Sequence, residues 1–242
     1  FLEGANIYQF APRSGVYPYF SRKIGLQSGN PIPILFGGRI IGKIGKVEVA
    51  AQQVKTRETS SLNSEDFSVI RLKQNFWKES SVGVLYTRRH TSKGNEINTP
   101  LPDRNTLGVD LTLNTSTFLK NQNLQFQAFA IFHNPNTLNE INNSIWDRSA
   151  RGIRINFPND PWSGSLSYRE FGNWYDPAVG FSRRNSFRRV EPRIRFSPLL
   201  EKSSVIRELQ LEISFENLMS LDWKRLTPVS YTHLTLPTRL MV

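Results

Sequence analysis

The stretch Leu107-Gly-Val-Asp-Leu-Thr-Leu-Asn114 alternates apolar and polar or small residues at every position. Successive side chains of a β-strand point to opposite faces, so this period of two predicts a strand with one apolar and one polar face. No segment has a convincing helical period of 3.6. The same alternation recurs in Val47–Gln52, Val82–Thr87, Leu124–Ala130, Gly152–Phe157, Ser165–Arg169, Arg193–Phe196 and Glu208–Glu216. Phe67–Phe76 is predicted to be a mixed strand, with Val69 and Arg71 on one face and Ile70 and Leu72 on the other.

The connections between these segments are alternately short and long. A repeat of about 40 residues with two long strands, one short turn and one long loop is typical of up-and-down outer-membrane barrels. A propeller blade has a similar period but four shorter strands, which argues against a propeller. The expected short connections are Gly45-Lys46, Trp77–Ser80, Ser116–Gln122, Pro158–Pro161 and Pro198–Ser204, and the long ones are Lys55–Asp66, Thr91–Asn105, Asn134–Asp147 and Gly172–Ser186.

The stretch Tyr19–Gly45 is predicted to be the first hairpin of the barrel, with strands at Tyr19–Gly25 and Ile32–Lys43. Within it, Gly37-Gly-Arg-Ile-Ile-Gly-Lys43 resembles a phosphate-binding loop. Ile44 stands where such a loop needs Ser or Thr, and a strand rather than a helix follows. The glycines are therefore interpreted as shaping a strand, by a bulge or a close approach to the backbone.

Composition fits a protein that is polar on one side of its sheet. Apolar residues make up 38% of the 242 residues and aromatic residues 12%. These values suit a membrane barrel with a polar interior, and equally a soluble β-sandwich with long loops. The sequence contains no apolar run of about 18 residues, so no membrane-spanning helix is predicted. The absence of cysteine excludes a disulfide scaffold and cysteine-based zinc sites.

The formal charge of +11 comes with no nucleic-acid-binding fingerprint, so nucleic acid is not an expected partner. A barrel would turn its polar strand faces into the lumen, whereas a sandwich would turn the same residues to bulk water. We expect a lumen in which arginines and carboxylates form ion pairs across strands. The charged residues expected to face it are Arg39, Arg154, Arg169, Arg193, Arg195, Glu208 and Glu212.

Aromatic residues gather beside the short connections, which is the expected position of rings at a membrane interface. The alternative is that these rings seal the end of a soluble core. The residues concerned are Phe76, Trp77, Phe118, Phe157, Trp162 and Phe196.

The long loop that begins at Gly172 carries the candidate ligand-binding residues. Its rings could stack on sugars, with a carboxylate and a guanidinium as polar partners. We favour the alternative, in which the rings fold over the barrel mouth and become buried. The candidates are Trp174, Tyr175, Asp176, Phe181 and Arg183.

No catalytic residue, metal site or cofactor is assigned. Glu208 and Glu212 share a strand face, but four residues along a strand span about 13 Å. Glycosidase carboxylates lie about 5–9.5 Å apart. His90 and His133 stand at the ends of different strands without metal-ligand spacing, and no nucleophile motif is present.

Several motifs, taken together, resemble a known group of proteins. The segments are Phe1–Gly4, Phe20–Gly25, Pro33–Lys43, Phe67–Lys73 with Ser80–Gly83 and Thr87-Arg88, and Asp176–Arg183. In this order they are similar to the uncharacterised β-barrel region that follows a family-9-type carbohydrate-binding domain in Gram-negative envelope proteins. The resemblance covers about residues 1–200. It implies an outer-membrane location and an upstream sugar-binding domain, but no catalytic residues. Proteins of this kind are sometimes described as glycan hydrolases.

We therefore predict an all-β, antiparallel up-and-down membrane barrel, incomplete at about ten or eleven strands. Residues 1–18 would be a lead-in or lumen segment, 19–227 the partial barrel, and 228–242 a non-native tail. Val229–Thr238 resembles a translated sequencing adapter, and Phe1 in place of Met suggests a fragment. The predicted barrel would lack its C-terminal closing strands.

The expected function is an outer-membrane barrel that binds or passes a ligand, a glycan, without chemistry of its own. Its expected partners are outer-membrane lipid and glycans. The alternatives are a carbohydrate-active hydrolase that acts with the upstream domain, and a soluble β-sandwich binding protein.

Overall fold

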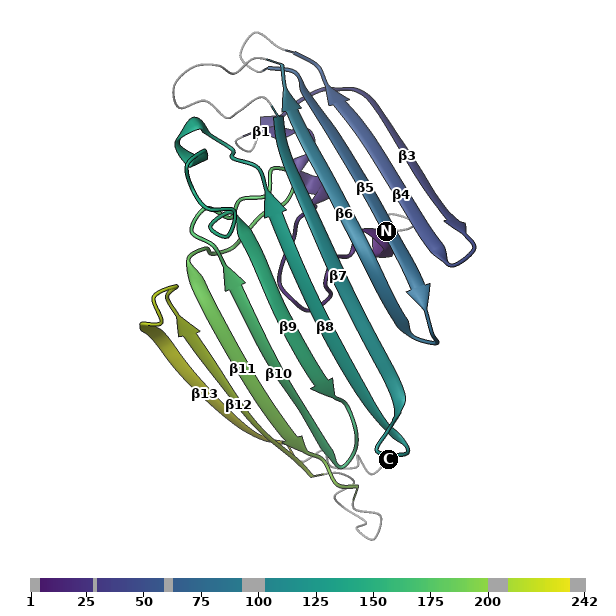
Figure 1. Cartoon of the computed structure of the whole chain (residues 1–242), viewed down its shortest axis with the longest axis vertical. Helices are drawn as coiled ribbons and strands as arrows, with labels where there is room; N and C mark the ends of the chain where they lie inside the picture. Colours follow the sequence, from purple (N-terminus) through teal and green to yellow (C-terminus); the bar gives the residue numbers. More distant parts are fainter. Residues whose placement is uncertain (1–4, 28–29, 59–62, 93–102, 200–208, 236–242) are drawn as a thin grey trace, which may run out of the picture.

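A computed structural model describes residues 5–27, 30–58, 63–92, 103–199 and 209–235. Its main element is one antiparallel sheet of eleven strands in which each strand pairs with its neighbour in sequence (Figure 1). The strands are β3 (Ile34–Ile44), β4 (Val47–Thr56), β5 (Glu65–Phe76), β6 (Ser80–Thr91), β7 (Asp103–Phe118), β8 (Gln122–His133), β9 (Ser149–Phe157), β10 (Trp162–Phe171), β11 (Phe187–Phe196), β12 (Gln210–Met219) and β13 (Arg225–Thr235).

The remaining regular elements are small. Strands β1 (Leu26–Gln27) and β2 (Asn30–Pro31) form a separate two-stranded sheet. Three short 3₁₀ helices lie at η1 (Ala5–Tyr8), η2 (Ser21–Lys23) and η3 (Leu138–Glu140). In the described ranges, no helix is both long and apolar enough to cross a membrane.

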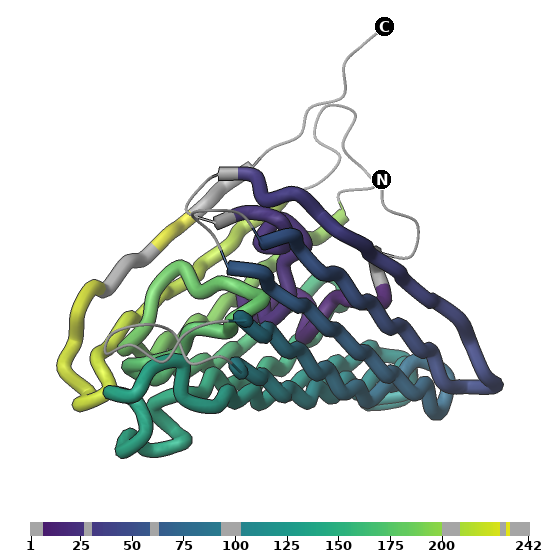
Figure 2. The backbone as a smooth tube through the Cα atoms, turned by 90° about the horizontal axis from the view of Figure 1, so that it is seen from above, coloured from purple at the N-terminus to yellow at the C-terminus, as the bar shows by residue number. Residues whose placement is uncertain are grey.

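The predicted all-β, antiparallel, up-and-down arrangement is confirmed, and so is the number of strands. The sheet is strongly curved, as the view from above shows (Figure 2). It is not closed into a barrel: β3 and β13 are its edges, and within the described residues each pairs with one neighbour only.

The predicted first hairpin is wrong. The first hairpin of the large sheet is β3–β4, joined at Gly45-Lys46. Tyr19–Gly25 forms no strand of this sheet, because its neighbouring backbone groups bond to a distant loop instead. Phe20 N donates to Val179 O at 2.9 Å, and Phe181 N donates to Tyr17 O at 2.9 Å.

The predicted alternation of short and long connections fails near the end of the sheet. Residues 197–209 join β11 to β12, a much longer connection than the expected Pro198–Ser204, while 220–224 make a short turn to β13. Strand β13 extends to Thr235 and thus into the predicted tail. The origin of that tail stays a prediction, and residues 236–242 lie outside the described ranges.

The two faces of the sheet differ in chemistry, as the period of two predicts. On the convex face, large apolar side chains are exposed on strand after strand, and the pairing register places them all on one side. They are Ile40, Ile44, Ile70, Leu72, Val84, Leu107, Val109, Ile153, Ile155, Leu166, Ile194, Leu211, Ile213 and Phe215. The concave face carries the polar and charged side chains together with the buried core.

Aromatic rings gather at the end of the sheet where the short turns lie. Phe76 and Trp77 have ring centroids 5.2 Å apart, and Trp162 and Phe196 4.5 Å apart. Phe118 and Phe157 form a third, edge-on pair at 6.4 Å. Trp77 is 81% exposed and Trp162 56% exposed, which is not the burial expected of rings that seal a soluble core.

Candidate functional site

The concave face is occupied by the N-terminal part of the chain, residues 7–25, which we name the inner segment (Figure 2). Ile7, Tyr8, Phe10 and Val16 of this segment are buried in one apolar cluster with side chains of the sheet, among them Phe129. The ring of Phe10 meets that of Phe129 edge-on, with centroids 6.2 Å apart. The inner segment therefore supplies five of the eighteen buried residues of this described cluster, and the partly buried Tyr19 and Ile24 pack against it.

A buried ion pair fixes the start of the inner segment. Arg71 on β5 is 1% exposed and forms two bonds with Asp110 on β7, at 2.5 and 3.0 Å. Arg71 Nε donates to the backbone oxygen of Ile7 at 3.3 Å, and Arg71 Nη2 donates to that of Gln9 at 3.2 Å. The backbone N–H of Ala11 donates to Asp110 Oδ2 at 3.3 Å. We name Arg71 and Asp110 the clamp.

Two strand glycines make room for these contacts. A β-carbon on Gly83 of β6 would lie 2.6 Å from the guanidinium nitrogens of Arg71. A β-carbon on Gly108 of β7 would lie 2.7 Å from the ring of Phe10. Both distances are shorter than van der Waals contact, so any larger residue at either position would displace the clamp or the inner segment.

The other end of the inner segment is held by the loop between β10 and β11, residues 172–186. Tyr17 stacks on Phe181 with ring centroids 4.7 Å apart, and Arg169 Nη1 donates to Ser14 O at 2.6 Å. Gly180 packs directly against the backbone of Tyr17 and Pro18. This loop and the inner segment thus form one packed unit at the loop end of the sheet.

The five residues proposed as ligand contacts are distributed over this unit. Tyr175 is fully buried, whereas Trp174 is 47% exposed. Asp176 is exposed and lies 3.8 Å from Lys23, and the Arg183 guanidinium stands 6.0 Å from the ring centre of Tyr17. The ring of Phe181 is stacked on the ring of Tyr17. Of the five candidates, Trp174, Asp176 and Arg183 are therefore exposed, Phe181 is half-buried and Tyr175 is buried.

Burial dominates the chemistry of Tyr175. Its hydroxyl finds no hydrogen-bond partner among the described residues, and its ring packs against Phe171 and beside His133. Burial raises the pKa of the Tyr175 hydroxyl well above its usual 10.0. The folded protein therefore disfavours ionisation of this side chain.

We predict that the wild-type protein loses stability above pH 10 more steeply than Tyr175→Phe. The folded-state pKa is raised, so the unfolded chain releases this proton first and stability falls as pH rises through the unfolded value. Release of the Tyr175 hydroxyl proton from the unfolded chain lowers the free energy of unfolding by about 1.4 kcal/mol per pH unit. Urea unfolding between pH 8 and pH 11 measures it. Parallel curves for the two proteins would contradict the buried, neutral hydroxyl.

Seven charged residues are expected to face the lumen, and the six that the structure describes lie on the concave face. Arg195 Nη2 lies 2.6 Å from Glu212 Oε2, Arg193 Nε lies 3.3 Å from Glu212 Oε1, and Arg169 is paired with Glu191. Arg39 and Arg154 lie on the same face. Glu208 lies outside the described residues.

The structure also brings together two carboxylates that sequence reasoning missed. Glu191 Oε1 on β11 and Glu216 Oε2 on β12 each lie 2.8 Å from the same Arg189 nitrogen, Nη2. The two oxygens are therefore no further apart than twice that distance, so they do not exceed the separation of about 5–9.5 Å seen between glycosidase carboxylates. However, Arg189 stands between them and Arg169 also bonds Glu191. The carboxylate oxygens of Glu191 and Glu216 are thus paired with arginine side chains, and the arrangement is an ion-pair network.

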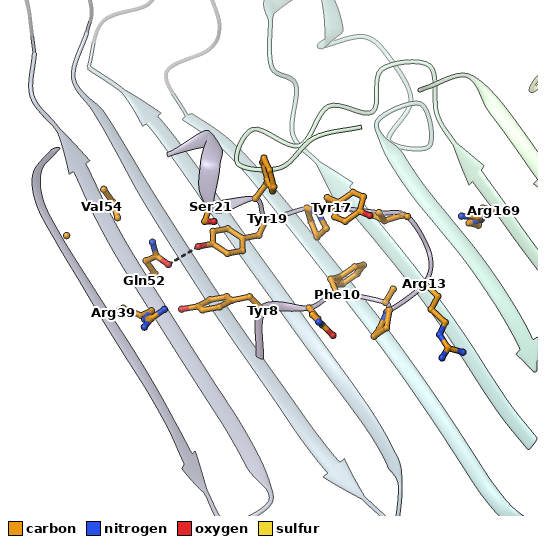
Figure 3. Close-up of a pocket in the computed structure, with 18 of the residues that line it drawn as sticks. Tyr8, Phe10, Arg13, Tyr17, Tyr19, Ser21, Arg39, Gln52, Val54 and Arg169 are labelled. Atoms are coloured by element: carbon orange, nitrogen blue, oxygen red, sulfur yellow. Dashed lines mark hydrogen bonds between the residues drawn. The ribbon is translucent and has the colours of Figure 1, made fainter. Parts of the chain in front are cut away.

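In the described part of the chain, no three His, Cys, Asp or Glu side chains converge in a way that could hold a metal ion. The main hollow is a cavity of about 860 Å³ between the inner segment and strands β3 and β4 (Figure 3). Tyr19 spans it and donates from its hydroxyl to Gln52 Oε1 at 2.9 Å. Its lining includes Tyr8, Phe10, Arg13, Tyr17, Tyr19, Arg39, Gln52 and Arg169.

Comparison with family models, with curated proteins and with solved structures finds no match for this chain. The site is therefore interpreted from its own geometry: a packed inner segment, a cavity beside it, and a concave face lined with charge.

Proposed function

We propose that the sheet is part of the wall of a Gram-negative outer-membrane β-barrel, and that its concave side binds or passes a glycan without chemistry of its own. The observation that carries the proposal is the apolar convex face. Exposed Ile, Leu, Val and Phe side chains run across nearly all of the sheet. Monomeric soluble proteins rarely expose contiguous apolar patches of more than a few hundred Å².

The soluble β-sandwich alternative would need a second layer over the convex face. The inner segment and its buried cluster lie on the opposite, concave face, and the only other sheet in the described residues is the small pair β1–β2. Lipid would cover the convex face as it is. The exposed Trp77 and Trp162 beside the short turns would then lie at a membrane interface.

The proposal requires further strands beside β3 and β13. An unpaired backbone N–H or C=O in hydrocarbon costs several kcal/mol, which is why spanning sheets are closed. Within the described residues, the large sheet has two such edges, β3 and β13.

A glycan is the proposed ligand for two reasons. The sequence resembles barrel regions that follow a carbohydrate-binding domain, and the 860 Å³ cavity combines aromatic rings with polar groups such as Gln52. The hydrolase alternative gains little from Glu191 and Glu216, because Arg189 occupies the space between their carboxylates.

The wall proposal predicts opposite quenching for labels on the two faces. The chain has no cysteine, so single variants can be labelled cleanly with a fluorophore. After reconstitution into vesicles, Leu107→Cys and Ile155→Cys labels on the convex face should be quenched several-fold by brominated acyl chains. Thr112→Cys and Gln127→Cys, on the same strands or a neighbour but on the concave face, are the matched controls.

The control labels should respond to aqueous iodide and little to brominated lipid. If iodide quenches the convex labels as strongly as the concave ones, and brominated lipid quenches neither set, the sheet is not a membrane wall.

A further inference from the structure

Most arginines described on the concave face have a carboxylate partner. Arg71 bonds Asp110, Arg89 bonds Glu65, Arg169 and Arg189 bond Glu191, and Arg193 and Arg195 bond Glu212. Three arginines around the inner segment differ. Arg13, Arg39 and Arg154 have no carboxylate within ion-pair distance among the residues that the structure describes.

These three arginines line two neighbouring hollows. Arg13 and Arg39 line the 860 Å³ cavity together with Arg169. Arg13, Arg154 and Arg169 line a small neighbouring cavity that shares the wall formed by Ala11 and Pro12. The described lining of the two cavities contains no Asp or Glu side chain. Arg169 is paired with Glu191, whereas Arg13, Arg39 and Arg154 bring positive charge that no described carboxylate neutralises at ion-pair distance.

A hydroxyl group next to this charge also lacks a partner. The Tyr8 hydroxyl is buried and makes no hydrogen bond in the described part of the chain. In Figure 3 it points toward Arg39. An acidic ligand bound at Arg39 would provide an acceptor close to this hydroxyl, whose isolation otherwise costs free energy.

We infer that the 860 Å³ cavity binds an anionic oligosaccharide, with one carboxylate at Arg39 and a second one at Arg13, the side of the cavity nearest Arg154. This inference rests on the proposed function and narrows its ligand class. Guanidinium groups form strong, charge-assisted bonds with carboxylates. Figure 3 places Arg39 at one end of the cavity and Arg13 with Arg169 at the other, so the ligand is elongated and acidic at more than one position. A volume of about 860 Å³ lies within the usual range of ligand sites.

The test compares two ligands with the same sugar backbone, one with free carboxylates and one whose carboxyl groups are neutral methyl esters. The full chain in detergent is titrated calorimetrically with tetragalacturonate and with its fully methyl-esterified form, at two salt concentrations. We expect the acid to bind at least about tenfold more tightly than the ester, with an affinity that falls as salt rises.

The variants separate a specific site from bulk charge. Arg39→Gln should weaken binding of the acid at least about fivefold and leave binding of the ester unchanged. Lys43→Gln is the matched control, because Lys43 lies on the same strand and the same face but outside the cavity lining. It should change the affinity for the acid less than twofold. Both side chains are exposed, so neither variant threatens folding.

Three outcomes would overturn the inference. If acid and ester bind equally and Arg39→Gln has no effect, glycan binding stands but the anionic site does not. If Lys43→Gln weakens binding as much as Arg39→Gln, the attraction is only bulk charge. If neither ligand binds to a chain whose convex labels are quenched by brominated lipid, the wall proposal survives and this ligand assignment fails.

Discussion

Replacing Asp110 by alanine is expected to lower the free energy of unfolding by about 3–5 kcal/mol and to release the start of the inner segment. Arg71 is 1% exposed, so without Asp110 it would keep a buried charge with no counterion. The backbone N–H of Ala11 would lose its acceptor as well. Denaturant unfolding measures the loss of stability. Limited proteolysis should show new cleavage within residues 7–25.

Asp103 on the same strand provides the control. Its pair with Arg88 is just as close, at 2.6 Å, but the side chains are 47% and 41% exposed. Exposed pairs contribute about 0–1 kcal/mol, so Asp103→Ala should cost far less than Asp110→Ala. If both variants lose the same free energy of unfolding, burial of the clamp does not add to the stability that it provides. The interpretation of the inner segment as a core element would then fail.

Replacing Gly180 by alanine is expected to cost about 1–3 kcal/mol and to detach the β10–β11 loop from the inner segment. The added methyl group would overlap the backbone oxygen of Tyr17 and lie 2.5 Å from the backbone carbon of Pro18. These neighbours are backbone atoms, so no change of side-chain rotamer relieves the clash. The measurements are the unfolding free energy and protease cleavage within residues 172–186.

Gly42→Ala is the matched control, because a β-carbon there meets no atom within 4 Å. Its stability should stay within about 0.5 kcal/mol of wild type, as for most surface substitutions. If Gly180→Ala leaves both stability and cleavage unchanged, the loop does not pack on Tyr17 in solution.

The strands were predictable because their signal is local. In Leu107–Asn114 the period of two alone assigns each side chain to a face, and the structure places Leu107 and Val109 on the convex side and Asp110 on the concave side. The expected strand at Tyr19–Gly25 failed because the backbone partners of this region, Val179 and Phe181, are supplied by a loop far away in the sequence. No local pattern reveals such a partner.

The candidate site was predictable only in part, for the same reason. The facing of Arg39, Arg154 and Arg193 follows from alternation, but which arginines are paired depends on neighbours across the sheet. Asp110 was visible only as the acid within an alternating strand, and its partner Arg71 lies 39 positions earlier. One sign of this packing was visible in the sequence. Gly83 and Gly108 stand at polar-face positions of their strands, where the missing side chains leave room for Arg71 and for the ring of Phe10.

The contact between Ala11 and Asp110 has a consequence for the order of folding, because it joins positions 99 residues apart. Hairpins such as β3–β4 and β5–β6 close short loops and can form early, whereas a contact of such sequence separation carries a larger loop-closure entropy and forms slowly. The inner segment should therefore pack only after β5, β6 and β7 have paired, because its contacts depend on side chains from these strands. Its residues would be among the last parts to gain protection from hydrogen exchange during refolding.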